Sequence, residues 1–96
     1  MTSDLDMRRR RALYRAQHRG TKEMDHLLGR FAEARLQGMD GATLDLFETL
    51  LTLPDPDLQT AIVMGGEIGG PELAGLLEAL RRFHGLAQSA AGAGGV

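Results

Sequence analysis

The residues best suited to chemistry lie in one short stretch, HRGTKEMD, at positions 18–25. Arg19 offers a planar guanidinium with several donors, which suits a carboxylate, a phosphate or a backbone carbonyl. Gly20 leaves the backbone bare, so that a partner can approach it closely. Glu23 adds an acceptor four residues after Arg19. A donor, a bare backbone and an acceptor in one turn indicate a contact loop for a partner molecule.

The same residues also have a purely local interpretation. A first helix that ends at Arg19 would place the cations of Arg15, His18 and Arg19 at its negative C-terminal end, where they are stabilising. Gly20 would then supply a left-handed turn and cap the next helix. In that register Glu23 takes the third helical position and completes a capping box. Both interpretations stay open at this point.

Catalytic and metal-binding patterns are missing from the sequence. It has no cysteine, its three histidines have no spacing that makes a ligand pair, and it contains no HExxH motif, Walker loop or dinucleotide fingerprint. The glycine-rich GGEIGG stretch follows a predicted helix rather than a strand, which disfavours a phosphate cradle. We therefore expect a protein that is not an enzyme, binds no metal and holds no cofactor stably.

Helical periodicity dominates the elements that must position the loop. A helix is predicted over 21–37 and ends at Gly38 in a left-handed cap. Asp40 is predicted to cap a third helix that stops near Leu53, ahead of Pro54. Each of these helices, and a last one opened by Pro71, carries an apolar stripe: Met24, Leu27, Leu28, Phe31 and Leu36; Leu44, Phe47, Leu50 and Leu51; Leu73, Leu76, Leu77, Leu80 and Phe83.

Two further helices complete the predicted fold. The segment Met7–His18 has few large apolar residues but is rich in Arg and Ala, which favour helix. In PDPDL, Asp55 is expected to cap a short helix that runs from Pro56 to about Met64 and ends at Gly65 and Gly66. The prediction is an all-α, small five-helix bundle in one domain, residues 1–86, with a disordered C-terminal tail, residues 87–96.

Charge is distributed unevenly along the 96 residues. Residues 1–19 hold six arginines and two aspartates, whereas residues 20–96 hold five basic and eleven acidic side chains. The chain is thus a basic arm on an acidic body, and such an arm could bind nucleic acid, an acidic lipid surface, a phosphate-bearing cofactor or an acidic protein. No run approaches the length of about 18 apolar residues that a membrane-spanning helix needs, so membrane insertion is not expected.

The loop and the fourth helix together resemble a known family. RRRALYRAQHRGTKEMDHLLGRF and LLTLPDPDLQTAI are similar to the small FAD assembly factors of succinate dehydrogenase, which occur in bacteria and mitochondria. The resemblance covers about residues 8–86. It rests on the pattern R-x-x-x-R-G-x-x-E-x-D-x-L-L and on D-P-D-L, matched by Arg15, Arg19, Gly20, Glu23, Asp25, Leu27, Leu28 and Asp55 to Leu58.

The resemblance implies an assembly chaperone with a five-helix bundle. It would bind the flavoprotein subunit of succinate dehydrogenase, or that of fumarate reductase, and promote covalent attachment of FAD, so that it works close to the partner's FAD. The protein would be cytoplasmic in a bacterium and located in the mitochondrial matrix in a eukaryote. The partner-binding residues implied are Arg19, Gly20 and Glu23, flanked by Arg15, Tyr14 and Asp25.

Two departures from the family pattern and two alternatives remain. His18 stands where a second arginine is common, and Ala61 stands where a tryptophan is usual, so a large packing group is missing from the fourth helix.

The first alternative is a small helical nucleic-acid-binding protein that uses the basic arm, which the acidic body disfavours. The second alternative is an adaptor bundle with no part in flavin attachment.

Overall fold

Helices provide the regular structure of residues 4–86, the part of the 96-residue chain that the computed structural model describes. This confirms the predicted all-α five-helix fold. The tail predicted to be disordered, residues 87–96, lies outside the described residues and stays a prediction. The helices are α1 (Asp4–Gln17), α2 (Lys22–Arg35), α3 (Gly41–Leu51), α4 (Asp55–Met64) and α5 (Ala74–Phe83), with two 3-10 turns at Leu36–Gly38 and Pro71–Leu73.

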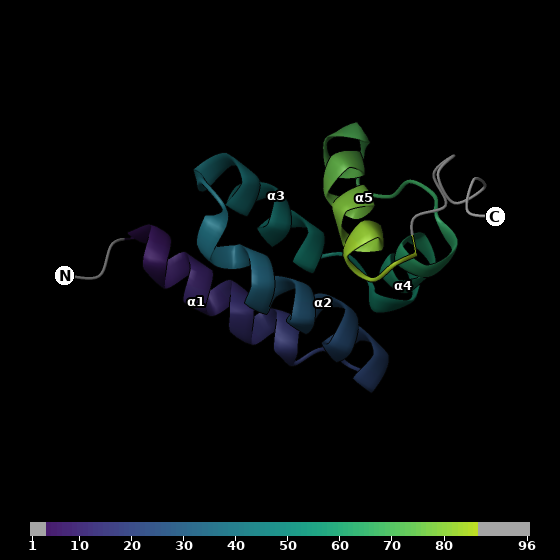
Figure 1. Ribbon diagram of the computed structural model, residues 1–96, viewed down its shortest axis with the longest axis horizontal. Helices are drawn as coiled ribbons and strands as arrows, with labels where there is room; N and C mark the ends of the chain where they lie inside the picture. The colour runs from purple at the N-terminus through teal and green to yellow at the C-terminus, as the bar shows by residue number, and fades with distance from the viewer. Residues whose placement is uncertain (1–3, 87–96) are drawn as a thin grey trace.

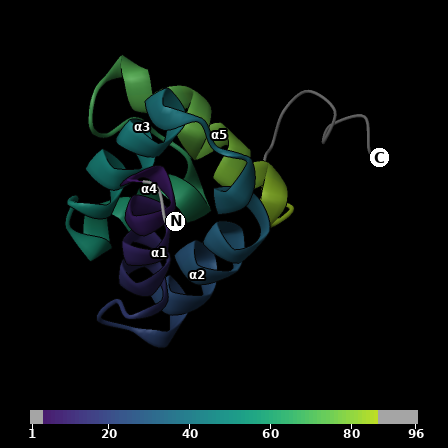
Figure 2. The same ribbon diagram turned by 90° about the vertical axis from the view of Figure 1, so that its left-hand side faces the viewer.

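Helices α1 and α2 form an antiparallel pair along one side of the molecule (Figures 1 and 2). Helix α3 packs mainly against α1, and α5 packs against α2 and α4. The predicted apolar stripes of α2, α3 and α5 all face the interior, with Phe83 at the end of its stripe half-buried. The largest fully buried side chains come from α2 to α5 and from the 3-10 turn before α5: Phe47, Met24, Leu28, Leu44, Leu50, Leu58, Ile62, Leu73 and Leu80.

Small residues bring α1 and α2 together. On α1 the buried residues are Ala12 and Ala16, whereas Met7 and Tyr14 are exposed. Opposite them, Gly29 of α2 is buried, and a Cβ atom added to it would lie 3.1 Å from Cγ of Gln17 and 3.4 Å from its Cα. The close approach therefore depends on the absence of a side chain at position 29.

The end of α2 differs from the prediction. Gly38 does not adopt a left-handed conformation, because α2 ends at Arg35 and the chain continues as a 3-10 turn. The N–H of Met39 donates to the carbonyl of Leu36 at 3.1 Å. This tighter turn buries both Leu36 and Met39 in the core, which a left-handed exit would not require. The predicted cap of α3 is confirmed, since Asp40 accepts from the N–H of Thr43 at 2.8 Å.

The fourth and fifth helices are joined by the glycine-rich loop. As predicted, α4 ends at Gly65, whose φ of 89° is open to glycine but strained for other residues. Ala61, where the family resemblance expects tryptophan, is buried, and Ile68 of the loop packs against the core nearby. A cavity of about 230 Å³ remains beside these two residues. Arg81 of α5 donates to the carbonyls of Ile62 and Leu86, both at 2.7 Å, and so fastens α5 to α4.

Candidate functional site: the Arg19 loop

The loop at residues 18–21 joins α1 to α2, and its local structure differs from the sequence prediction. Helix α1 ends at Gln17, so Arg19 lies two residues beyond it. Gly20 is not among the glycines with positive φ. Thr21 rather than Gly20 caps α2, because its hydroxyl accepts from the N–H of Met24 at 3.2 Å and a bare glycine has no acceptor to offer. The predicted capping box of Glu23 is therefore wrong.

Arg19 points into the protein rather than toward solvent. Its side chain is 11% exposed, and it forms an ion pair with Asp55 at the start of α4. The guanidinium donates to Oδ1 of Asp55 through Nε at 2.9 Å and through Nη2 at 2.6 Å. It also donates to the carbonyls of Leu51 at 2.8 Å and Leu53 at 3.2 Å. These carbonyls lie at and beyond the end of α3, where helical partners are lacking, so Arg19 satisfies acceptors that α3 leaves free.

Asp55 and Asp25 hold the backbone of the same loop. Oδ2 of Asp55 accepts from the N–H of Gly20 at 3.1 Å, and a Cβ atom on Gly20 would lie 3.2 Å from that oxygen. Asp25, one turn into α2, accepts from the N–H of Arg19. We call Arg19, Gly20, Asp25 and Asp55 the Arg19 clamp. A Cβ atom at position 20 would crowd the carboxylate of Asp55, so either this carboxylate or the loop would have to shift slightly.

Asp55 does not cap α4, contrary to the prediction. Pro54 takes the capping position, and Asp55 is the first residue of the helix and forms no side-chain cap. Its carboxylate is directed to Arg19 and Gly20 instead. Local sequence signals could not reveal this contact, because Arg19 and Asp55 are separated by 36 positions.

The remaining predicted site residues lie on the outside of the clamp. Tyr14 is 63% exposed, and its ring stacks on that of His18 with 4.0 Å between the centroids. His18 is held by a contact of 2.8 Å between its Nδ1 and the carbonyl of Tyr14. Arg15 and Glu23 are exposed and form no ion pair within residues 4–86. The structure therefore divides the six residues into an inner set, Arg19, Gly20 and Asp25, and an outer set, Tyr14, Arg15 and Glu23.

Part of the arginine cluster is also used internally. Arg8 pairs with Glu48 and Asp45 of α3, and its Nη2 lies 2.8 Å from Oε1 of Glu48. These hydrogen bonds raise the pKa of Arg8, and the bond from Arg8 lowers the pKa of the Glu48 carboxyl below its usual value. The arm is thus held to the body by ion pairs between α1 and α3.

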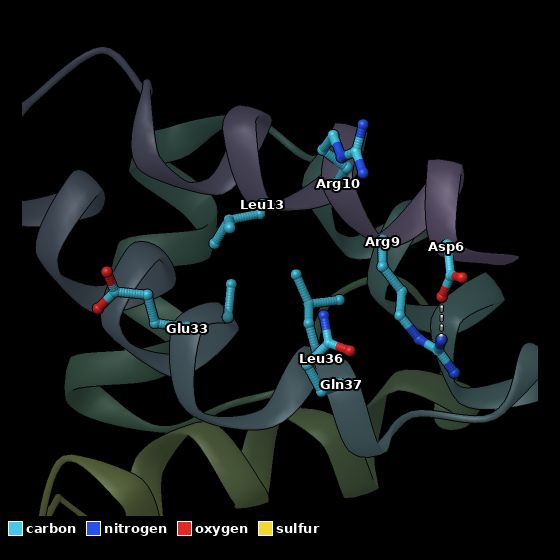
Figure 3. Close-up of a pocket in the computed structure, with 8 residues that line it drawn as sticks. Asp6, Arg9, Arg10, Leu13, Glu33, Leu36 and Gln37 are labelled. Atoms are coloured by element: carbon cyan, nitrogen blue, oxygen red, sulfur yellow. Dashed lines mark hydrogen bonds and ion pairs between the residues drawn. The ribbon is translucent and has the colours of Figure 1, made fainter. Parts of the chain in front are cut away.

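Arg9 ties the start of α1 to the turn after α2. It donates to Asp6 at 3.0 Å and to the carbonyl of Met39 at 2.7 Å. Figure 3 shows this pair at one end of a pocket of about 540 Å³, where Leu13 and Leu36 point into the middle and Glu33 lies at the other end. Arg10 is exposed and directed away from the middle of the pocket (Figure 3). Arg8 and Arg9 are therefore structural, whereas Arg10 presents its charge to solvent.

No group of three or more His, Asp or Glu side chains within residues 4–86 is arranged to hold a metal ion. The structure does bring two histidines together that are far apart in sequence: the rings of His26 and His84 lie 5.5 Å apart, and Nε2 of His84 contacts the carbonyl of Leu27 at 2.8 Å. Among the described residues, none of the helices is both long enough and apolar enough to span a bilayer.

Comparison with known proteins finds relatives that are named as assembly factors of FAD or of succinate dehydrogenase. The chain is 47% identical over 55 residues to the FAD assembly factor SdhE of Acetobacter pasteurianus, covering 57% of this chain and 50% of the relative. It is 41% identical over 54 residues to the mitochondrial succinate dehydrogenase assembly factor 2 of Debaryomyces hansenii, covering 56% of this chain and 38% of the relative. The corresponding protein of Dictyostelium discoideum is 33% identical over 66 residues, 69% of this chain and 47% of the relative.

The matched regions therefore span half or less of the length of these relatives. No solved structure matches the chain. The family described as flavinator of succinate dehydrogenase matches residues 10–84, which include the Arg19 clamp and all five helices except the start of α1. The chain belongs to the family of flavinators of succinate dehydrogenase.

Proposed function

We propose that the protein is a non-catalytic assembly chaperone that binds the flavoprotein subunit of succinate dehydrogenase and promotes covalent attachment of FAD to it. The flavoprotein of fumarate reductase is a second client of the same kind. The bond-forming chemistry belongs to the partner and its flavin, and this chain holds no FAD of its own. Its contribution is to keep the partner in a conformation in which the flavin and its acceptor side chain are aligned.

The observation that carries this proposal is the rigid loop with an exposed outer set beside it. The Arg19 clamp holds residues 19–20 in place through five hydrogen bonds to Asp55, Leu51 and Leu53. Tyr14, Arg15 and Glu23 are therefore presented from a preorganised surface, which lowers the entropy lost on binding. An exposed aromatic ring next to an arginine is also the composition that binding hot spots favour.

The clamp changes the role expected of Arg19. Its guanidinium is already satisfied by four acceptor contacts inside the protein, so we assign it the task of shaping the loop. We assign direct contact with the partner to the outer set, Tyr14, Arg15 and Glu23, and to the exposed backbone of Gly20. The nucleic-acid alternative loses three of the six arginines of the basic arm, because Arg8, Arg9 and Arg19 are engaged in internal contacts.

Co-expression with a flavoprotein that needs an assembly factor tests the proposal. Covalent flavin on the partner is measured by in-gel fluorescence for the wild type and for Tyr14→Ala, Glu23→Gln and Gly20→Arg. Arg30→Gln on α2 serves as a charge control. We expect strong loss of covalent flavin with Gly20→Arg, and partial loss with the two outer-set variants while their circular dichroism and stability match the wild type. Full flavin attachment with all three variants would refute the proposed site.

A further inference from the structure

A second surface lies away from the Arg19 loop, in a groove of about 620 Å³ between α2, α3 and α5. In Figure 1, α3 and α5 lie on the same side of the α1–α2 pair, and no residue of α1 lines the groove. Its volume falls within the range of roughly 300–1,000 Å³ that is typical of binding pockets. We refer to it as the α2–α5 groove.

The floor of the α2–α5 groove is apolar and aromatic. Phe31, Met39 and Leu76 are almost fully buried beneath it, and Phe83 is half-buried at its side. The rings of Phe31 and Phe83 meet edge to face, with 5.6 Å between their centroids. The lips carry exposed alanines, Ala34 on α2 and Ala79 on α5, so no large side chain closes the groove at these two positions.

Two guanidinium groups border this floor. Arg35 lies over the ring of Phe83 at 5.4 Å from its centroid and forms no hydrogen bond or ion pair within residues 4–86. The side chain of Arg82 is 68% exposed. One of its nitrogens, Nη2, forms an ion pair with Oε2 of Glu78 on the same helix at 3.2 Å. Both therefore keep donors free for an incoming carboxylate. The one acid that lines the groove, Asp40, already accepts from the N–H of Thr43 as the cap of α3.

The position of these cations is unusual for this body. Residues 20–96 carry eleven acidic side chains and only five basic ones. Of the five, Arg81 is used inside the protein by the carbonyls of Ile62 and Leu86. Two of the other four border the α2–α5 groove, and they do so next to its aromatic floor. With Asp40 counted as an anion, the lining of the groove carries one more positive than negative charge beside its apolar floor, which favours a ligand that combines negative charge with an apolar side chain.

We infer that the α2–α5 groove binds a segment of the partner flavoprotein in which an apolar side chain is flanked by carboxylates. The apolar side chain lies on Phe83 and Leu76, while Arg35 and Arg82 pair with the carboxylates. This inference rests on the proposed function, since it gives the same partner a second contact on a different face. A two-point contact would fix the orientation of the flavoprotein, which a single loop contact leaves free to pivot.

Site-specific photocrosslinking tests the inference with the intact protein and the apo-flavoprotein. A photoreactive phenylalanine analogue replaces Ala79 in the groove, Tyr14 beside the Arg19 loop, or Val63 on α4 as a control position outside both surfaces. We expect crosslinks from Ala79 and Tyr14 but not from Val63. The peptide crosslinked at Ala79 should carry Asp or Glu next to an apolar residue.

The crosslinking outcomes separate the two proposals. Crosslinks from Tyr14 alone overturn the groove and leave the proposed function standing. Crosslinks from neither position overturn both. A crosslink from Ala79 alone supports the groove and contradicts the loop as the working site. A crosslink from Ala79 to a segment without carboxylates overturns the chemistry assigned to Arg35 and Arg82.

Variants of the groove add a quantitative test by titration calorimetry with the flavoprotein. The double change Arg35→Glu and Arg82→Glu should weaken binding about tenfold and reduce its salt dependence, whereas the corresponding lysine variant should lose less. Ala79→Trp should weaken binding by filling the groove without a change of charge. Glu78→Gln should strengthen binding, because Glu78 competes for Arg82, and an unchanged affinity in all of these variants would overturn the inference.

Discussion

Arg19 shows how one side chain can settle the position of a loop. Its guanidinium contacts a carboxylate and two carbonyls from a segment more than thirty positions away, and it is largely shielded from water. Because the acceptors are fixed by the end of α3 and the start of α4, the loop after α1 has one favoured position. A charged group that is buried in this way is costly to leave unpaired.

Replacement of Arg19 should be strongly destabilising. Arg19→Ala leaves Oδ1 of Asp55 and two carbonyls without their donors, and we expect the free energy of unfolding to fall by about 3 kcal/mol. Arg19→Lys should recover only part of this, because a single ammonium group cannot reproduce the fork that reaches four acceptor contacts. Urea unfolding measures both, and a double-mutant cycle with Asp55→Asn isolates the pair. Equal stability of Arg19→Lys and the wild type would contradict the geometry.

The substitution Gly20→Ala tests whether the close approach of the Asp55 carboxylate matters for stability. In Gly20→Ala the added Cβ lies 3.2 Å from Oδ2 of Asp55, so either the carboxylate or the loop must shift. We expect a loss of about 1 kcal/mol in the free energy of unfolding, similar to other mutations that disturb a hydrogen-bonded contact. Gly38→Ala is the matched control, because nothing lies within 4 Å of its Cβ position. A cost at Gly38 equal to that at Gly20 would show that contact with Asp55 is not the cause.

At the scale of the helices, the close contact of α1 and α2 depends on Gly29. In Gly29→Val the β-branched side chain would meet Gln17 of α1, because even a Cβ atom alone at position 29 lies only 3.1 and 3.4 Å from the nearest Gln17 atoms. We expect a loss of about 2 kcal/mol or more, which overpacking of a tight contact typically produces. Gly75→Ala on α5 should instead gain about 0.5–1 kcal/mol, because it has open space and alanine favours helix. Thermal unfolding of both variants decides between these effects.

The pairing of α1 with α3 gives a pH dependence whose sign follows from Glu48. Its pKa is lowered in the folded protein by the hydrogen bond from Arg8, so the folded state favours the charged carboxylate. The corresponding stability is present above the pKa of Glu48 in the unfolded chain and is lost as the pH falls through the lowered value. Glu48→Gln should therefore flatten the fall in unfolding midpoint on acidification below about pH 5. A curve parallel to that of the wild type would exclude this pair as a source.

Sequence signals predicted the helices well where the signals are local. Asp40 caps α3 and Gly65 ends α4 as expected, because a cap or a left-handed glycine acts within one turn. They failed where a distant partner decides the structure. The contact of Arg19 with Asp55 spans 36 positions, and the contact of Gly29 with Gln17 had no signal beyond a glycine inside a helix. The cap of α2 is a different case: Thr21 offers the hydroxyl that Gly20 lacks, so the signal was local but was assigned to the wrong residue. The partner-binding role of the segment stays a prediction, and its division into inner and outer residues depends on tertiary contacts that local sequence signals do not reveal.

At the scale of the whole molecule, the basic arm and the acidic body form one electrostatic system. Six arginines lie in residues 1–19, and the body that they pack against has eleven acidic side chains. Arg8 spans the two parts through Glu48 and Asp45, and Arg9 reaches the carbonyl of Met39. The attraction holds α1 in place even though its own buried residues are only two alanines.

The attraction between the basic arm and the acidic body predicts that added salt lowers the stability of the folded protein. Added NaCl screens the attraction between exposed or half-exposed charges, so the urea midpoint of the wild type should fall as NaCl is raised from about 0.01 M, where the Debye length is near 30 Å, to about 0.15 M, where it is near 8 Å. Arg8→Gln should have a lower midpoint at low salt and a smaller salt dependence, because its pairs with Glu48 and Asp45 are gone. Arg82→Gln, which loses only an exposed pair within α5, is the matched control and should retain the wild-type salt dependence. If both variants respond to salt as the wild type does, the packing of α1 against α2 and the core holds the arm without help from the Arg8 ion pairs.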